Sequence, residues 1–145
     1  MKVVLQRVRT AAVVVDGRTV GEIGPGYLLL VGIAQGDDET TVRRLAADVA
    51  KARLMPDPQG KFGVTLRDAG AEALAVSQFT LLADFTKGNR PSFNGAARPE
   101  VARPLFDRFA QELGALLGRP VPTGVFGADM AVTLVNDGPV TVVLE

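Results

Sequence analysis

The sequence lacks both cysteine and histidine. Without cysteine the chain can form no disulfide, no thiol nucleophile and no thiolate metal site. Without histidine it lacks the commonest general base and the commonest metal ligand, which excludes a Ser-His-Asp triad, a Cys-His pair and a histidine-bearing zinc site. Any catalysis must therefore use carboxylates, hydroxyls, lysine, backbone amides or groups of the substrate. We expect neither a metal nor a cofactor.

The sequence also lacks an excess of charge of either sign and a long apolar run. Sixteen Lys and Arg residues balance sixteen Asp and Glu residues. A zero balance argues against a protein that grips long stretches of phosphate backbone, but it allows a small basic patch. The longest uncharged apolar run, residues 27–34, is far too short to span a bilayer, and no targeting segment is evident. We therefore expect a cytoplasmic protein with no membrane and no DNA partner.

Length and composition predict a single domain that spans residues 1–145. A chain of 145 residues and 15.2 kDa buries roughly 68% of its extended surface on folding, which is enough for a core without disulfides or metals. The hydrophobic fraction of 47% and the charged fraction of 22% are ordinary for a globular protein.

Runs of valine and leucine predict a β-rich N-terminal part. Strands are expected at residues 2–9, 11–15 and 18–23, with Asp16-Gly17 as a hairpin turn. Residues 27–34 have no polar face, and a strand that is apolar on both faces needs cover on both sides. This strand predicts a layered fold in which it lies in the middle.

Two amphipathic helices are expected. The first begins at Asp37 or Asp38 and ends by Pro56, and the second runs from Pro99 to Gly118. Apolar residues at helical spacing predict the buried faces, which are Val42, Leu45, Ala46, Val49 and Ala50 in the first helix and Val101, Leu105, Phe109, Leu113 and Leu116 in the second.

The remaining segments are expected to be strands, a loop and a turn. They are a short edge strand at 61–66, an apolar strand at 73–82, a loop at 84–98, and final strands at 121–126, 128–135 and 140–144, with a turn at 136–138.

Polar residues interrupt the strand expected at 73–82. Alternation would place Gln78 and Thr80 on one face and Ser77 and Phe79 on the other. Polar side chains in an apolar strand either bond to backbone at a strand end or face a site. From the pattern alone the structural interpretation is favoured, because most buried polar groups are simply satisfied.

A Gly-Pro pair lies in the closing segment, residues 136–141, whose sequence is Asn-Asp-Gly-Pro-Val-Thr. Gly-Pro before a strand usually marks only a turn. The alternative is a cis Gly138-Pro139 bond, which a minority of X-Pro bonds adopt.

A third motif is basic. The segment from Thr86 to Arg103 holds four cations, Lys87, Arg90, Arg98 and Arg103, against Glu100 alone. A basic loop that also carries Phe93 could contact phosphates and a base. A solvated surface loop is the commoner outcome for such a cluster.

Together these residues resemble one family, the D-aminoacyl-tRNA deacylases. Four segments carry the resemblance in the family's order and spacing, which are residues 1–8, 77–81, 87–93 and 136–141. The resemblance covers the whole chain and implies a three-layer α/β fold with mixed, largely antiparallel sheets and two main helices. It also implies a homodimer with the active site at the dimer interface.

The resemblance implies hydrolysis of the ester between a D-amino acid and the 3′ end of tRNA, which releases the D-amino acid and free tRNA. Such an enzyme proofreads translation and rejects L-aminoacyl-tRNA. Because glycine has no side chain to clash, glycyl-tRNA mischarged on tRNA-Ala is also expected to be a substrate.

The resemblance also assigns roles to residues. Gly138-Pro139 would be a cis pair that one subunit inserts into its partner's pocket, where main-chain carbonyls hold the substrate's amino group and exclude an L side chain. Arg7 would hold this segment. The remaining assignments are catalytic roles for Ser77, Gln78, Phe79 and Thr80, contact with the terminal adenosine for Phe126 and Met130, and candidate RNA contacts for Lys87 and Arg90.

Two mechanisms remain open at this point. In one, the Thr80 hydroxyl attacks the carbonyl and forms an acyl-enzyme, which requires a base to activate it. In the other, Thr80 only positions the substrate, backbone N–H groups near Phe79 and Thr80 hold the oxyanion, and the substrate's 2′-hydroxyl helps to activate water. The second is favoured because the strand offers no base.

Two other classes of function compete with the deacylase. One is a non-catalytic dimeric module that binds tRNA 3′ ends or D-amino acids without turnover. The other is an ordinary esterase that ignores the tRNA. Hydrolysis of D-Tyr-tRNA, L-Tyr-tRNA and a D-amino-acid ester without ribose distinguishes all three.

Overall fold

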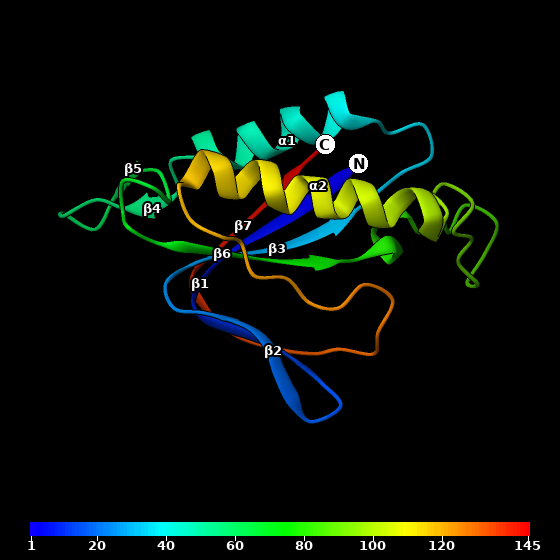
Figure 1. Cartoon of the computed structure of the whole chain (residues 1–145), viewed down its shortest axis with the longest axis horizontal. Coiled ribbons are helices and arrows are strands. Elements are labelled where there is room, and N and C mark those ends of the chain that lie inside the picture. The colour runs from blue at the N-terminus through cyan, green and yellow to red at the C-terminus, as the bar shows by residue number, and fades with distance from the viewer.

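The computed structural model describes all 145 residues and has two helices packed on a curled sheet (Figure 1). The main sheet contains β1 (Lys2–Val15), β2 (Arg18–Ile23), β3 (Gly26–Gly32), β6 (Glu72–Ser77) and β7 (Ala131–Leu144). All of its strand pairs are antiparallel except the parallel pair of β3 and β6. The predicted class, mixed α/β with largely antiparallel strands and two main helices, is confirmed.

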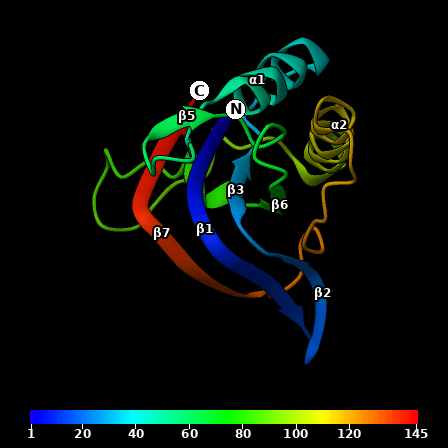
Figure 2. The same cartoon turned by 90° about the vertical axis from the view of Figure 1, so that its left-hand side faces the viewer.

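Curvature of the long strand β1 turns one sheet into two layers (Figure 2). Its first half pairs with β3, its second half pairs with β2, and β7 follows its other edge. Leu29 and Ala75 belong to the core beneath the helices, whereas Leu28 and Leu74 belong to a second core against the other half of the sheet. Both faces of β3 are therefore covered, as the apolar run predicted.

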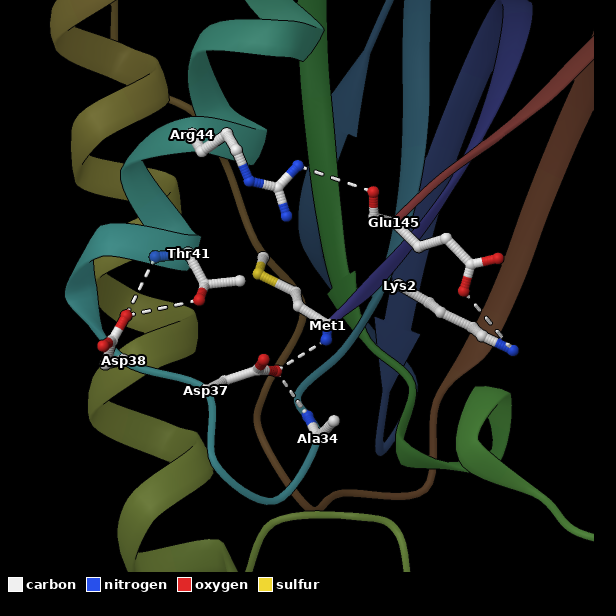
Figure 3. Close-up of polar contacts among 8 residues, drawn as sticks. All are labelled: Met1, Lys2, Ala34, Asp37, Asp38, Thr41, Arg44 and Glu145. Carbon is white, nitrogen blue, oxygen red and sulfur yellow. Dashed lines mark hydrogen bonds and ion pairs between the residues drawn. The ribbon is translucent and has the colours of Figure 1, made fainter.

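Helix α1 (Glu39–Lys51) begins where polar groups join it to the strands (Figure 3). Asp38 caps the helix, since its carboxylate accepts from the Thr41 N–H at 3.0 Å. That hydrogen bond holds the pKa of Asp38 below its usual value. Asp37 accepts from the Ala34 N–H at 2.7 Å and pairs with the Met1 amine at 2.8 Å. The start of α1 is thus tied to the end of β3 and the beginning of β1.

Helix α2 (Pro99–Leu117) has the predicted bounds but a different buried face. Gly118 ends it in the left-handed region at φ 74°. The residues it buries are Ala102, Phe106, Phe109, Leu113 and Leu117. Val101 and Leu116 are 48% and 42% exposed, so the expected face is wrong by one position at both ends. Neither helix is long and apolar enough to cross a membrane.

The strand expected at 73–82 is wrong in its second half. β6 ends at Ser77, and Phe79–Leu82 form a short 3₁₀ helix, η1. The Gln78 N–H donates to Val31 O at 2.7 Å, after which the chain turns over the end of β3. A Cβ at Gly32 would lie 2.9 Å from Gln78 O, so glycine permits this close approach. The expected alternation of Gln78 and Thr80 does not apply, because η1 is not a strand.

The C-terminal strands also differ from the expectation. Residues 121–126 form no strand, although Thr123 makes an isolated bridge to Ala75. The strands expected at 128–135 and 140–144 are one strand, β7. The segment from Asn136 to Gly138 is therefore not a chain reversal.

The segment that contains Gly138 and Pro139 is instead a bulge in β7. Asn136 pairs with Val8 and Thr141 pairs with Gln6, so the residues between them stand opposite Arg7 alone. The Gly138-Pro139 peptide bond is cis, which agrees with the prediction.

The edge strand expected at 61–66 is shorter, since β5 (Phe62–Val64) pairs with β4 (Met55–Pro56) in a small separate hairpin. The two strands expected at 2–9 and 11–15 are the single strand β1.

Candidate active site

A pocket of about 570 Å³ lies where the end of β6, η1 and the beginning of α2 meet the segment that leads into β7. Most of its lining is apolar. The residues that give it chemical character are Ser77, Gln78, Phe79, Phe93, Phe126 and Met130. The structure thus brings together five of the predicted site residues, and Phe93 of the basic loop joins them.

Thr80 lies beside the pocket rather than in its lining. Its hydroxyl accepts a hydrogen bond from the Gln78 side-chain amide. No carboxylate or lysine forms a hydrogen bond with Thr80. An amide cannot serve as a general base, so no group hydrogen-bonded to this hydroxyl could remove its proton.

The first backbone N–H groups of η1 are free. The N–H groups of Phe79 and Thr80 donate to no backbone or side-chain acceptor of the chain, because the first donors of a helix have no partner within it. Phe79 also lines the pocket. Two adjacent free donors at the rim of an apolar pocket are suited to an oxyanion.

Aromatic rings form two sides of the pocket. Phe79 and Phe93 meet edge to face, with ring centroids 5.1 Å apart. Phe126 packs against the buried Phe106 at 6.3 Å, and the Arg103 guanidinium lies 5.0 Å from the Phe126 ring centroid. A flat base could pack against rings held in this way.

Arg7, Gly138 and Pro139 do not line this pocket. Arg7 is 12% exposed, and its Nη1 donates to Leu54 O at 2.8 Å. Its Nε donates to Asp137 O at 3.1 Å and lies 3.5 Å from the Asp137 carboxylate. The Phe62 ring covers the guanidinium, with 5.4 Å to its centroid. Arg7 thus holds the residue that precedes Gly138, and this cluster is separate from the pocket of the same chain.

Lys87 and Arg90 lie in an exposed loop next to the pocket residue Phe93. The loop is closed by two backbone hydrogen bonds between Asp84 and Ser92, of 2.8 and 2.9 Å. The Thr86 N–H donates to the Asp84 carboxylate at 2.9 Å and lowers the pKa of Asp84. Neither Lys87 nor Arg90 forms an ion pair, so both charges are free.

Several lining residues were missed in the sequence. They are Ala96, Ala97, Pro99 and Ala102, at and just before the beginning of α2, and Gly127 and Ala128, which precede β7. Small apolar residues carry no chemical signal, so only their position in the fold reveals them.

The protein-family comparison matches residues 4–145 to the family model described as D-Tyr-tRNA(Tyr) deacylase. A D-aminoacyl-tRNA deacylase of Chromobacterium violaceum is 58% identical over 145 residues, which is 100% of this chain and 97% of the relative. A D-aminoacyl-tRNA deacylase of Thermomicrobium roseum is also 58% identical, over 100% of this chain and 94% of the relative.

Two solved structures resemble the whole chain. A c-Myc DNA Unwinding Element Binding Protein has a TM-score of 0.94 at 37% identity, with 100% of this chain and 98% of that chain covered. A probable eukaryotic D-amino acid tRNA deacylase has a TM-score of 0.86 at 16% identity, with 99% of this chain and 97% of that chain covered. At that identity the likeness concerns the fold alone.

Proposed function

This chain belongs to the D-aminoacyl-tRNA deacylase family and hydrolyses D-aminoacyl-tRNA as a proofreading step, and from this premise we propose how its residues perform the reaction. One observation carries the proposal. A single pocket holds Ser77, Gln78 and Phe79 beside Phe126 and Met130, whereas Gly138 and Pro139 lie outside it. The terminal adenosine binds against Phe126 and Met130, and the ester reaches η1.

The chemical step uses main-chain donors. The free N–H groups of Phe79 and Thr80 donate to the ester carbonyl oxygen as it becomes an oxyanion. A water molecule, activated with the help of the substrate's 2′-hydroxyl, adds to the carbonyl carbon. The tetrahedral intermediate then collapses, the bond to the ribose 3′-oxygen breaks, and that oxygen takes up a proton. No histidine is required, which suits a chain that contains none.

Thr80 positions η1 and does not act as nucleophile. The Thr80 hydroxyl oxygen accepts from the Gln78 side-chain N–H, and the hydroxyl proton donates to no base of the chain. We expect Thr80→Ala to retain measurable turnover. Mass spectrometry during turnover should detect no acyl-enzyme, and an acyl adduct on Thr80 would contradict this mechanism.

Chiral selection comes from a second copy of the chain. The backbone of Gly138 and Pro139 from one subunit enters the pocket of its partner, where carbonyl oxygens accept from the substrate ammonium and occupy the space of an L side chain. The separation of this bulge from the pocket of its own chain supports the arrangement. The functional unit is a homodimer with the site at its interface.

The proposed partner is the tRNA acceptor end, and the proposed location is the cytoplasm. The unpaired charges of Lys87 and Arg90 beside Phe93 favour contact with phosphates near that end. Glycyl-tRNA is proposed as an additional substrate, since glycine places no side chain against Gly138 and Pro139.

The test compares D-Tyr-tRNA, L-Tyr-tRNA, glycyl-tRNA and a D-tyrosine ester without ribose. We expect hydrolysis of the D-aminoacyl and glycyl substrates, little hydrolysis of L-Tyr-tRNA, and little of the ester without ribose. Equal hydrolysis of the two tyrosyl-tRNAs would contradict the selection by Gly138 and Pro139. Rapid hydrolysis of the simple ester would contradict the role of the 2′-hydroxyl.

A further inference from the structure

The only arginine stacked on a ring of the pocket is Arg103, in the second turn of α2. Its guanidinium lies 5.0 Å from the Phe126 ring centroid, and Phe126 lines the pocket while Arg103 itself does not. The ring is supported by Phe106, which is buried in the core beneath α2. Arg103 is therefore held at the outer rim of the part of the pocket proposed to take the base.

The charge of Arg103 is not neutralised within the chain. Arg103 takes part in no ion pair, although Glu100 and Asp107 lie three and four residues away on the same helix. Its side chain also makes no hydrogen bond to a carbonyl, unlike Arg7 and Arg53. By contrast, Arg108, which lies on the same helix, pairs with Glu112 at 3.1 Å.

We propose that Arg103 forms a subsite for the 5′-phosphate of the terminal nucleotide, so that the enzyme recognises a nucleotide and not only a nucleoside. This inference rests on the proposed position of the adenosine against Phe126. The 5′-phosphate is the anion nearest to the terminal base in the substrate, and a charged group is expected to stay outside an apolar pocket, where Arg103 also lies. Guanidinium groups bind phosphate oxygens with two parallel N–H donors, and stacking on Phe126 orients the plane that presents them.

The test uses a pair of small substrates that differ only in the phosphate, 3′-O-D-tyrosyl-adenosine and its 5′-phosphate, together with D-Tyr-tRNA. In the unaltered enzyme the 5′-phosphate should raise kcat/KM about ten-fold, the range of one charged hydrogen bond. Arg103→Ala should remove that advantage, chiefly through KM, and reduce hydrolysis of the compound without phosphate far less. Arg103→Lys should restore part of it.

The matched control is Lys51→Ala, which removes one exposed cation at the end of α1, far from the beginning of α2 (Figure 1). It should leave all three substrates unaffected. With D-Tyr-tRNA, Arg103→Ala should also reduce the slope of log kcat/KM against log salt by about 0.7, the value for one phosphate contact on a single strand.

An equal loss on both small substrates would show that Arg103 only supports the Phe126 ring, and the phosphate subsite would be wrong. No loss on either would also overturn it. Absence of D-Tyr-tRNA hydrolysis by the unaltered enzyme would instead refute the proposed function. In that case the affinity for adenosine 5′-phosphate, measured by calorimetry, still tests the subsite, since equal affinities of the enzyme and Arg103→Ala would overturn it.

Discussion

At the scale of single residues, Arg7 connects three parts of the chain. It donates to Leu54 O and Asp137 O and lies under the Phe62 ring. Arg7→Ala should free the bulge of β7 and admit L-aminoacyl-tRNA. A hydrogen bond to a charged group contributes about 1.5–3 kcal/mol, so the ratio of kcat/KM for D- and L-Tyr-tRNA should fall roughly 10- to 100-fold.

Arg9 provides the matched control for this prediction. Its side chain is 71% exposed and only approaches the Asp137 carboxylate, at 3.8 Å. Exposed ion pairs contribute little, so Arg9→Ala should leave the D/L ratio unchanged. An unchanged ratio in Arg7→Ala would mean that Arg7 does not hold the selecting segment.

Tyr27 allows a second residue-scale prediction, on stability. The ring is fully buried, and its hydroxyl accepts from the Leu54 N–H at 3.2 Å. Tyr27→Phe leaves that N–H without its partner and should lower the free energy of unfolding by about 1–3 kcal/mol. Urea denaturation at neutral pH measures the loss, and an unchanged midpoint would contradict it.

The same residue predicts a dependence on alkaline pH. Burial raises the pKa of Tyr27, against smaller opposing effects of the Leu54 hydrogen bond and the Arg7 charge. Because the pKa is raised, the neutral Tyr27 hydroxyl contributes its full share to the free energy of unfolding below pH about 10. This contribution is lost as pH rises through the pKa of the folded state. Because Tyr27 is the only tyrosine, the ultraviolet absorbance of tyrosinate reports its ionisation directly. The Tyr27→Phe variant should lack the part of the alkaline loss of stability that the ionisation of Tyr27 causes.

At the scale of elements, the position of η1 depends on a glycine in a neighbouring strand. A Cβ at Gly32 would lie 2.7 Å from Leu82 Cδ2 and 2.9 Å from Gln78 O. Gly32→Ala should therefore push η1 away from β3. Overpacking should cost about 1–3 kcal/mol of stability, and a displacement of the catalytic N–H groups should lower kcat/KM on the order of 10²-fold.

Gly95→Ala is the control for that element. Its Cβ would meet only Leu82 O, at 3.9 Å, which is an ordinary contact. It should therefore leave activity and stability nearly unchanged. If Gly32→Ala kept full activity, the geometry of η1 would not determine the rate.

At the scale of the whole molecule, the proposed active site requires two chains. Dilution below the dimer dissociation constant should abolish turnover, because Gly138 and Pro139 lie outside the pocket of their own chain. Light scattering or analytical ultracentrifugation measures the mass at each concentration at which activity is assayed. A fully active monomer would contradict the shared site.

The sequence by itself determined the local features whose cause lies within a few residues. The apolar run in β3 required cover on both faces, one of Asp37 and Asp38 was expected to cap α1, and Gly118 ended α2. The absence of histidine and cysteine excluded a Ser-His-Asp triad and a Cys-His catalytic pair. The four motifs also indicated the family, and three predicted site residues of the motif at 77–81, Ser77, Gln78 and Phe79, line one pocket with Phe126 and Met130.

Only the tertiary structure decided features that depend on distant partners. In α2, adjacent apolar residues offered two possible buried faces, and packing selected Ala102 over Val101 and Leu117 over Leu116. β6 ended early because η1 crosses Gly32, which lies far away in sequence. The Gly138-Pro139 segment became a bulge, not a turn, because β1 continues beneath it. The sequence shows which residues are apolar. Which of them become buried depends on the elements that pack against them in the folded chain.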